Sequence, residues 1–517
     1  MLASVVTAVT SGIEGTLVQV EVDVAPGLPV CRIVGLPDSA LTEARERVRS
    51  ALRNAGFSYP LARITVNLAP AERRKRGSAY DLAIAAGILA ASGQVRIARP
   101  AALLGELSLG GRLLPVPGLL PLVATLVAAG YRRVVVPAED AGTAAWVEGA
   151  EVLPAVDLAE AVGYLRPVRR AGAGRTASPG RTGPLEPPRL SPAPSGAEPG
   201  GPEPADLAEV AGQAAGRRAL EIALAGGHHL LLTGSPGAGK TLLARTIPAL
   251  LPPLTADEAR EVALVRSAAG LPAAPNRAPF RAPHHTTSYA ALIGGGPSLR
   301  PGLVSLAHAG VLFLDELAEF PRDVLDALRQ PLEDGTVEVA RAHGVTRFPA
   351  RLQLVAAMNP CLCGWEGDPE RPCRCPAGGP ERYRRRVSGP LLDRIDLRVR
   401  LERVPADRVL VPRGAEASAP VAVRIARARA RARDRNGGLP NARAAGAGLI
   451  AEAADLAGWI AGRIEGSRQE PATSRGVVRL LRVARTIADL AGRERIGEAE
   501  VLEAIALRSD PFPGGTG

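Results

Sequence analysis

The chain has 517 residues, which is more than one hydrophobic core accommodates and indicates about three domains. No apolar run reaches the roughly 18 residues of a membrane-spanning helix, and the N-terminus lacks the pattern of a signal peptide, so we expect a cytoplasmic protein without a membrane partner. The formal net charge of +11 makes a polyanion such as DNA a reasonable partner, although a bias toward arginine throughout the chain accounts for the same charge.

Proline and glycine mark a linker after the first third of the chain. Residues 168–205 are rich in Pro, Gly, Ala and Arg, and their only leucines are Leu185 and Leu190. Such a segment cannot bury enough apolar surface to offset the entropy lost on ordering. We therefore predict a flexible linker at 168–205, between an N-terminal domain at 1–167 and a second domain that begins at residue 206.

A phosphate-binding loop follows this linker. After the apolar run 229–233, a complete G-x-x-x-x-G-K-T pattern is formed by Gly234, Ser235, Pro236, Gly237, Ala238, Gly239, Lys240 and Thr241. Between a strand and a helix, the backbone N–H groups of such a loop surround nucleotide phosphates, the lysine reaches the terminal phosphates and the threonine hydroxyl holds Mg²⁺. We therefore predict ATP and Mg²⁺ as cofactors.

Polar residues at two further strand ends complete a site for hydrolysis. The apolar run 311–314 ends in Asp315 and Glu316, which predicts a buried parallel strand with Asp315 directed at Mg²⁺ and Glu316 at the attacking water. Asn359 follows the apolar run 352–357 and is placed to orient that water. We therefore expect hydrolysis of ATP and not merely its storage.

Four of the five cysteines cluster in the sequence as two C-x-C pairs, Cys361 with Cys363 and Cys373 with Cys375. A disulfide is disfavoured in the cytosol, whereas four thiolates from two short turns suit a tetrahedral Zn²⁺ site. The C-x-C spacing is tighter than the usual C-x-x-C, so free or redox-active thiols are the alternative. Cys31 stands alone in an apolar setting and is predicted to be a core residue.

Several longer strings together resemble one family. They are residues 33–38, 63–70, 283–288, 310–316, 388–397 and 482–490. On these strings the chain resembles, over nearly its whole length, the magnesium-chelatase-like ComM/YifB family of AAA+ ATPases. The resemblance implies an α/β fold class with a P-loop AAA+ αβα core at 206–405, a helix-2 insertion, a cysteine-rich insertion at 361–375 and a C-terminal helical lid at 406–517.

The same resemblance assigns roles to three polar residues. Asn359 matches the first sensor, Arg394 the arginine finger and Arg475 the second sensor on the lid. An arginine finger that a neighbouring subunit supplies stabilises the charge of the transition state, so the resemblance implies a homo-oligomeric ring, expected to be hexameric. The alternative for Arg394 is a surface ion pair with Asp393 or Asp396.

Residues 1–167 resemble a Lon-protease-like, S5-type α+β domain, on the strings 76–82 and 105–115. A Lon-type protease needs a serine nucleophile and a lysine base. Those two positions fall on Ala79 and Leu120 in this chain, so the domain is expected to be catalytically inactive. It more plausibly assembles the ring or contacts DNA, and the basic residues 73–76 are a candidate for the second role.

Two segments match the substrate-gripping loops of related motors. Residues 288–303 carry the glycine run 294–296, and residues 335–349 read as a strand-turn-strand hairpin with Arg341, His343 and Arg347 near its turn. We expect both to face the pore of a ring, and the alternative for the basic residues is a solvated hairpin edge. The neighbouring His284 and His285 are expected to form hydrogen bonds within their loop and not to bind a metal.

In the lid, arginines recur on one face of a predicted helix. They are Arg424, Arg427, Arg431 and Arg435, with Arg429 and Arg433 beside them. This face is predicted to be either a DNA-backbone or intersubunit surface, or simply a solvated basic face.

The family resemblance implies an ATP-driven DNA translocase or helicase that promotes branch migration during recombination or natural transformation, acting on branched or single-stranded DNA. Aromatic residues make up only 3% of the chain, which favours contacts with the nucleic-acid backbone over stacked bases. The alternative is a magnesium-chelatase-type ATPase that remodels a protein partner, although the chain has no long acidic tract. A protein unfoldase is disfavoured, because no aromatic pore tip stands near residues 294–296.

Overall fold

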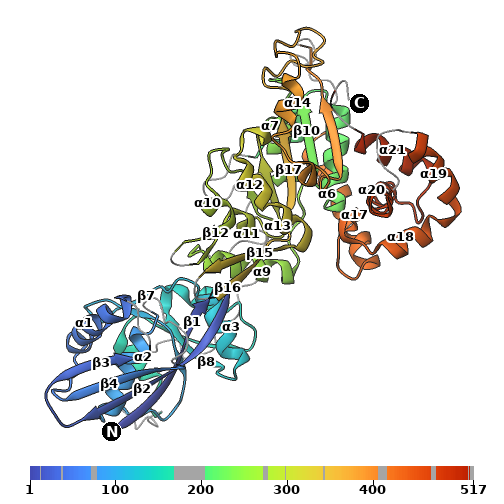
Figure 1. Cartoon of the computed structure of the whole chain (residues 1–517). Coiled ribbons are helices and arrows are strands. Elements are labelled where there is room, and N and C mark those ends of the chain that lie inside the picture. Colours follow the sequence, from blue (N-terminus) through green and yellow to red (C-terminus); the bar gives the residue numbers. More distant parts are fainter. Residues whose placement is uncertain are drawn as a thin grey trace.

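The computed structural model describes residues 1–11, 13–35, 39–70, 79–167, 204–271, 277–296, 299–341, 344–405, 416–466, 473–509 and 512. Within these ranges a sheet-based N-terminal unit, a central unit on a second sheet and a C-terminal unit of helices follow one another along the chain (Figure 1). The predicted linker at 168–205 and the basic residues 73–76 fall wholly or almost wholly outside the described ranges. Every helix within them is too short or too polar to cross a membrane.

The N-terminal unit contains a seven-stranded sheet in the order β3-β4-β2-β1-β5-β8-β9. Side chains alternate between the two faces of a strand, and Val18, Val20 and Val22 of β2 accordingly share one fully buried face. The strands are β1 (Leu2–Ser11), β2 (Glu14–Ala25), β3 (Val30–Val34), β4 (Arg63–Ala69), β5 (Ala102–Leu103), β8 (Arg133–Pro137) and β9 (Glu151–Ala155), with a short pair β6 (Glu106–Leu107) and β7 (Leu113–Leu114). The helices are α1 (Ser39–Asn54), α2 (Asp81–Ala91), α3 (Leu119–Ala128), α4 (Ala141–Ala144) and α5 (Leu158–Gly163).

Helix α2 lies at the centre of the core of this unit. Its sequence is apolar all round, and every residue of the helix except Ala90 is buried. Gly87 lets the helix approach the sheet closely, because a Cβ at this position would lie 2.6 Å from Cγ2 of Val22. Ala79 and Leu120, the positions aligned with a protease serine and lysine, are both buried apolar side chains. The lone Cys31, predicted to be a core residue, is only partly buried and packs against the margin of this core.

The central unit is built on a five-stranded parallel sheet in the order β11-β14-β17-β10-β18. Its strands are β11 (Phe280–Arg281), β14 (Val311–Leu314), β17 (Gln353–Met358), β10 (Leu230–Gly234) and β18 (Leu397–Leu401). The three middle strands are buried along their whole length, which explains why their sequences are continuous apolar runs. The predicted α/β fold class with a parallel sheet is therefore confirmed.

Helices surround this sheet, and two hairpins project from the central unit (Figure 1). The hairpins are β12 (Gly294–Gly295) with β13 (Arg300–Pro301), and β15 (Thr336–Arg341) with β16 (Gly344–Pro349). They occupy the segments 288–303 and 335–349, where hairpins were predicted. The helices are α6 (Ala214–Gly226), α7 (Lys240–Arg245), α8 (Ile247–Leu250), α9 (Ala256–Ala268), α10 (Tyr289–Ile293), α11 (Leu303–Leu306), α12 (Arg322–Ala327), α13 (Arg329–Asp334), α14 (Gly379–Arg384) and α15 (Gly389–Leu392).

The C-terminal unit is helical and shares a hydrophobic core with the central unit. Its helices are α17 (Ser418–Arg435), α18 (Gly446–Glu452), α19 (Ala457–Gly466), α20 (Ser474–Ala491) and α21 (Glu498–Arg508). Ile425 of α17 and Leu480 of α20 belong to the same buried cluster as Leu220 of α6. This unit, the predicted lid, therefore packs directly on a helix of the central unit.

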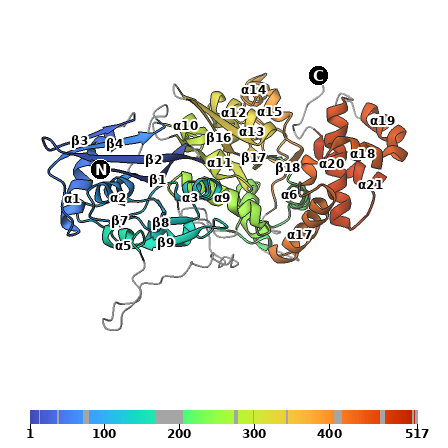
Figure 2. The ribbon, with the colours of Figure 1, turned by 90° about the horizontal axis from the view of Figure 1, so that it is seen from below.

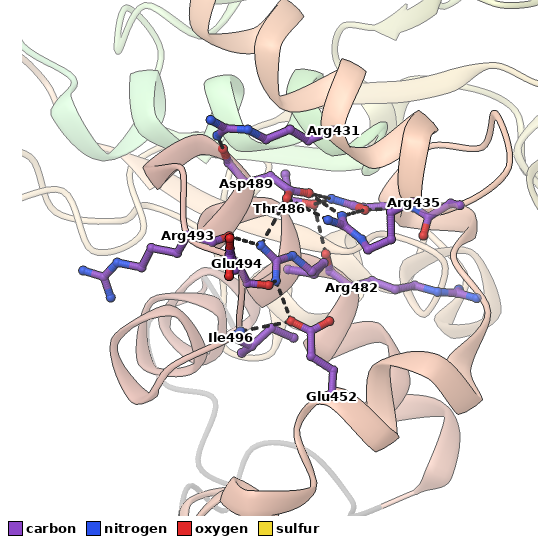
Figure 3. A network of polar contacts seen from close by, with 12 residues as sticks. Arg431, Arg435, Glu452, Arg482, Thr486, Asp489, Arg493, Glu494 and Ile496 are labelled. Atoms are coloured by element: carbon purple, nitrogen blue, oxygen red, sulfur yellow. Dashed lines mark hydrogen bonds and ion pairs between the residues drawn. The ribbon is translucent and has the colours of Figure 1, made fainter.

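The arginines of α17 do not form the free basic face that their spacing predicted. Arg435 pairs with Asp489 of α20, and the guanidinium of Arg431 donates to the Asp489 carbonyl oxygen at 2.6 Å (Figure 3). The others contact acidic groups or carbonyl oxygens: Arg424 pairs with Glu221 and Glu416, Arg433 with Glu258, and Arg429 donates to the Leu224 carbonyl oxygen. Five of the six arginines therefore join the lid helices to one another and to the central unit, whereas Arg427 is exposed, and the DNA-backbone or intersubunit role stays a prediction.

Helix α3 of the N-terminal unit lies beside α9 of the central unit (Figure 2). The backbone N–H groups of Gly118 and Leu120 donate to the carbonyl oxygen and the hydroxyl of Ser267, at 2.9 and 3.1 Å. Trp146 adds an apolar contact with a small cluster that includes Leu254 and Val262. No side chain next to Gly118 caps α3, so Ser267 of the central unit caps this helix.

Candidate nucleotide-binding and hydrolysis site

The phosphate loop connects the end of β10 to the start of α7. Its three glycines, Gly234, Gly237 and Gly239, all have positive φ, at 158°, 80° and 86°, a region that favours glycine. At Gly234 the neighbouring strand adds a steric reason, because a Cβ there would lie 2.4 Å from the Leu401 carbonyl oxygen. The G-x-x-x-x-G-K-T pattern therefore folds as the predicted strand-loop-helix turn, and the loop leads from β10 into the first turn of α7.

Lys240 is buried beneath this loop and is fully engaged. Its ammonium group donates to the carbonyl oxygens of Gly234 and Ser235, at 2.7 and 3.0 Å, and to Oδ1 of Asn359 at 3.0 Å. Burial lowers the pKa of Lys240 to about 8, and the nearby carboxylates of Asp315 and Glu316 partly offset this effect. The predicted first sensor, Asn359, is thus in direct contact with the phosphate-binding lysine.

Thr241 and Asp315 lie next to each other where a metal ion is predicted. The Thr241 hydroxyl donates to Oδ2 of Asp315 at 2.6 Å, and Asp315 directly follows β14. Because β14, β17 and β10 are parallel neighbours, Asp315, Asn359 and the phosphate loop meet at the carboxyl edge of the sheet. A hydroxyl and a carboxylate are the hard oxygen ligands that Mg²⁺ prefers beside nucleotide phosphates, so the two residues fit this ion.

Glu316 has an unusual backbone and a partner that the sequence did not reveal. Its φ is +53°, in the left-handed region that is uncommon for residues other than glycine. Its carboxylate lies 3.0 Å from Nδ1 of His285. His284 bonds to Thr286 within its own loop, as predicted, but the same prediction is wrong for His285.

The two arginines with predicted roles in hydrolysis share one carboxylate. Arg475 of α20 contacts Glu333 of α13 at 3.0 Å, and Arg394 contacts the other oxygen of the same side chain. Neither guanidinium contacts the phosphate loop within the described part of the chain. The suggested pairing of Arg394 with Asp393 or Asp396 is not found, because Asp396 instead binds Arg479 at 3.1 Å.

The segment before α6 also contacts the phosphate loop. Gln213 has a positive φ of 54°, and its side-chain amide donates to the Ala238 carbonyl oxygen at 2.8 Å. The contact places this segment against the nucleotide site, although the sequence alone did not single out Gln213 as the contact residue.

The four clustered cysteines come together in space as free thiols. The Sγ atom of Cys361 lies 3.4 Å from that of Cys363 and 3.7 Å from that of Cys373, and those two are 3.6 Å apart. All four Sγ atoms, including that of Cys375, lie within 4.8 Å of one another. A tetrahedral zinc site with Zn–S bonds of about 2.3 Å has sulfur atoms roughly 3.8 Å apart, so this cluster has the dimensions of such a site.

A cleft rich in arginine lies beside α12 and α14. Its volume is about 410 Å³, and it is lined by Ala318, Glu319, Phe320, Arg322, Arg382, Arg385 and Arg386. Arg386 pairs with Glu319 of the lining at 3.0 Å, and Arg322 lies 3.9 Å from Asp326 of its own helix. On the β15–β16 hairpin, Arg347 is exposed and pairs with Glu338 at 2.6 Å, whereas the side chains of Arg341 and His343 lie outside the described residues.

Three family models match the chain in order: "Subunit ChlI of Mg-chelatase" at 20–140, "Magnesium chelatase, subunit ChlI" at 206–409 and "Magnesium chelatase, subunit ChlI C-terminal" at 415–508. The chain is 43% identical to an uncharacterised protein of Mycobacterium tuberculosis (strain ATCC 25618 / H37Rv) over 507 residues, which cover 96% of both chains. It is 40% identical to the uncharacterised protein YifB of Escherichia coli (strain K12) over 518 residues, 98% of this chain and 97% of YifB.

The chain is similar to the same extent to a relative whose name indicates a biological role. The competence protein ComM of Haemophilus influenzae is 39% identical over 521 residues, which cover 98% of this chain and 97% of that protein. These matches span the N-terminal unit, the phosphate loop, the cysteine cluster and the lid alike. The chain therefore belongs to the magnesium-chelatase-like ComM/YifB family and carries an AAA+ ATPase domain of the chelatase type.

Proposed function

We propose that this protein is an ATP-hydrolysing ring motor, expected to be hexameric, that moves along DNA as a branch-migration helicase or translocase. The observation that supports assembly into a ring is the position of Arg394. Its side chain is held by Glu333 and not by the phosphate loop of its own chain, although the family assigns it to the transition state of hydrolysis. A neighbouring subunit that supplies this arginine completes the site.

Charge and kinship support DNA as the substrate of the motor. The net charge is +11, and the cleft beside α14 gathers Arg322, Arg382 and Arg385 with a single glutamate. Such a surface binds the phosphate backbone with release of counterions. The name of the competence protein ComM points in the same direction, toward uptake or processing of DNA during transformation.

Mg²⁺ and Zn²⁺ have separate roles in this proposal. Mg²⁺, bound with ATP beside Thr241 and Asp315, supplies charge neutralisation at the phosphates. Zn²⁺ is held by Cys361, Cys363, Cys373 and Cys375 as a closed structural site, because four thiolates leave no open coordination position. Elemental analysis of reduced protein purified without chelators is expected to find about one zinc per chain.

The proposal is tested by the dependence of ATP hydrolysis on DNA structure. Turnover by the full chain is measured without DNA, with a single strand, with a fork and with a four-way junction, and Glu316→Gln serves as the blank. Stimulation by branched DNA is the expected result. The family models named for the chelatase subunit ChlI favour a second candidate, an ATPase that remodels a protein partner. A rate of ATP hydrolysis that is the same with and without each of these DNAs would support this second candidate.

Two double variants identify which surface of the protein binds DNA. Arg341→Ala with Arg347→Ala on the β15–β16 hairpin is expected to abolish unwinding while basal hydrolysis persists. Arg382→Ala with Arg385→Ala in the α14 cleft is the matched comparison, because it removes the same charge elsewhere. Each lost phosphate contact lowers the slope of log affinity against log salt by about 0.7 to 0.9, so the variant with the shallower slope identifies the surface that binds DNA.

A further inference from the structure

The cysteine-rich segment lies directly against the phosphate loop. Gly364, between the two C-x-C pairs, has a φ of +82° and packs on Pro236, the third residue of the phosphate loop. A Cβ at Gly364 would lie 2.6 Å from Cδ and 2.7 Å from Cγ of Pro236. Because the contact leaves no room for even a methyl group, a shift in this segment is transmitted to the loop that holds the phosphates.

A carboxylate of the cysteine-rich segment lies near the phosphate loop. Oδ1 of Asp368 accepts hydrogen bonds from the backbone N–H groups of Glu370 and Arg371, both at 3.0 Å, which fix the carboxylate. The nearby side chain of Ser235 in the phosphate loop is the first cause that holds the pKa of Asp368 below its ordinary value. Oδ2 of Asp368 has no hydrogen-bond partner among the described residues, so Gly364 provides the direct contact with the loop.

The middle of the cysteine-rich segment is anchored to the rest of the central unit. Glu366 pairs with Arg384 of α14 at 2.9 Å, and its carbonyl oxygen accepts from Arg400 of β18 at 3.1 Å. The guanidinium of Arg371 lies 4.7 Å from the ring of Trp365. These contacts hold the residues between the two cysteine pairs in place. The two turns that carry the cysteines are held together by contacts among the four thiols.

The cluster is also continuous with the sensor strand. Cys361 is buried two residues after Asn359, whose side chain accepts from Lys240 at 3.0 Å. The Sγ atom of Cys363 accepts from the backbone N–H of Arg374 at 3.3 Å, a contact that stabilises a thiolate and orders the second turn. One ion at this cluster would therefore tie together the end of β17 and both turns of the segment that touches Pro236.

We propose that a thiolate-bound metal ion at Cys361, Cys363, Cys373 and Cys375 holds this segment as a wall of the nucleotide site, so that metal occupancy sets the affinity for ATP. The inference rests on the zinc proposed above. The physical cause is ordering: without the ion, the two cysteine turns are held by weak thiol contacts, so Gly364, which directly follows Cys363, is held less firmly against Pro236.

Two glycine variants test the contact without touching a metal ligand. Gly364→Ala and Gly378→Ala impose the same left-handed strain, at φ of +82° and +70°, but only Gly364 meets the phosphate loop, whereas Gly378 faces open space. Gly364→Ala is expected to weaken binding of a fluorescent ATP analogue by about tenfold, the usual scale of an overpacked contact, with zinc still at one per chain. Gly378→Ala should bind as the parent does, and equal affinities for both variants would overturn the contact.

Removal of the metal tests the coupling itself. The full chain is stripped with a chelator under reducing conditions, its zinc content is measured, and the affinity for the same analogue is determined before stripping, after stripping and after addition of ZnCl₂. A loss of about tenfold or more that zinc restores is the expected result. If zinc is present and can be removed without any change in the affinity for the analogue, the coupling is wrong but the zinc site is correct. If the protein neither contains nor binds zinc, the zinc site and the coupling are both wrong.

Discussion

Nδ1 of His285 lies 3.0 Å from a carboxylate oxygen of Glu316, the residue placed to activate the attacking water. Glu316 reaches this position with a left-handed backbone, at a φ of +53°, so both its main chain and its side chain are constrained. A carboxylate held by a neighbouring histidine is less free to reorient than an unpartnered one. Both features therefore limit how the carboxylate of Glu316, the predicted catalytic base, can turn toward a water molecule.

Replacement of His285 should relieve this restraint. His285→Ala is expected to raise basal ATP hydrolysis by roughly threefold to tenfold, the effect of losing one hydrogen bond that contributes about 0.6 to 1.4 kcal/mol. The measurement is steady-state turnover without DNA. His284→Ala is the matched comparison, because its ring bonds to Thr286 and packs on the His285 ring, with centroids 4.1 Å apart, but has no described contact with Glu316, so it should change turnover less. A slower His285→Ala enzyme would show that the histidine supports Glu316 during catalysis.

The two halves of the nucleotide site should separate in mutants. Lys240→Ala removes the ammonium group that binds phosphate, so it should lose nucleotide affinity. Glu316→Gln keeps the phosphate loop intact and should bind ATP normally, while turnover falls by about 10² to 10⁴ because the general base is lost. Equilibrium binding and turnover, measured on the same preparations, distinguish the two effects. Parental turnover by Glu316→Gln would contradict the role assigned to it.

Arg394→Ala should leave ATP binding nearly intact and lower turnover by about 10³ or more, as expected for a lost arginine finger. Mixed with Glu316→Gln subunits, it should poison assembled rings, because each defect lies on a different side of a shared site. Turnover is measured against the ratio of the two variants. Arg347→Ala, an exposed arginine of the hairpin, is a control whose basal turnover should equal that of the parent.

Nucleotide binding should become weaker as the pH rises above about 8. Burial lowers the pKa of Lys240 to about 8 without nucleotide, so its ammonium group loses a proton above that pH. The phosphates of ATP favour the charged form and raise this pKa, which means that binding near pH 8.5 takes up a proton. Calorimetry in buffers of different ionisation enthalpy measures the uptake. Lys240→Arg, which stays charged, should show no proton uptake from this residue.

The lid depends on a buried arginine at its centre. Arg485 is 1% exposed, pairs with Asp489 at 3.1 Å and donates to the Glu494 carbonyl oxygen at 2.8 Å. Arg485→Ala removes one partner of Asp489, which keeps Arg435, and the guanidinium that binds Glu452, so it should lower the opening free energy of α20 and α21 by about 1 to 3 kcal/mol. Amide hydrogen exchange measures this loss. Arg427→Ala on the exposed side of α17 should change it by no more than about 0.5 kcal/mol.

The phosphate loop, the carboxylate pair and the cysteine cluster could be predicted because each is encoded within a few consecutive residues. A buried parallel strand followed by Asp315 and Glu316 leaves little freedom in where those side chains lie. The family resemblance added Arg394 and Arg475, but not the carboxylate of Glu333 that both contact.

The arginines of α17 and the partner of Glu316 show what a local pattern cannot reveal. Helical spacing correctly placed these arginines on one helix, yet their partners Glu221, Glu258 and Asp489 come from α6, α9 and α20. His285 precedes Glu316 by some thirty residues and meets it only because β11 and β14 are neighbours in the sheet. Such pairs are set by tertiary packing, so periodicity alone assigned these side chains to solvent or to their own loop.

The helix cap shared between α3 and Ser267 has a mechanical consequence. Two backbone donors at the start of α3 are satisfied only by a residue of α9, so separating the two units would expose both and cost about 1 kcal/mol for each. A displacement of α9 would therefore carry α3, and the strands β1 and β2 on which α3 packs, along with it for as long as both hydrogen bonds hold.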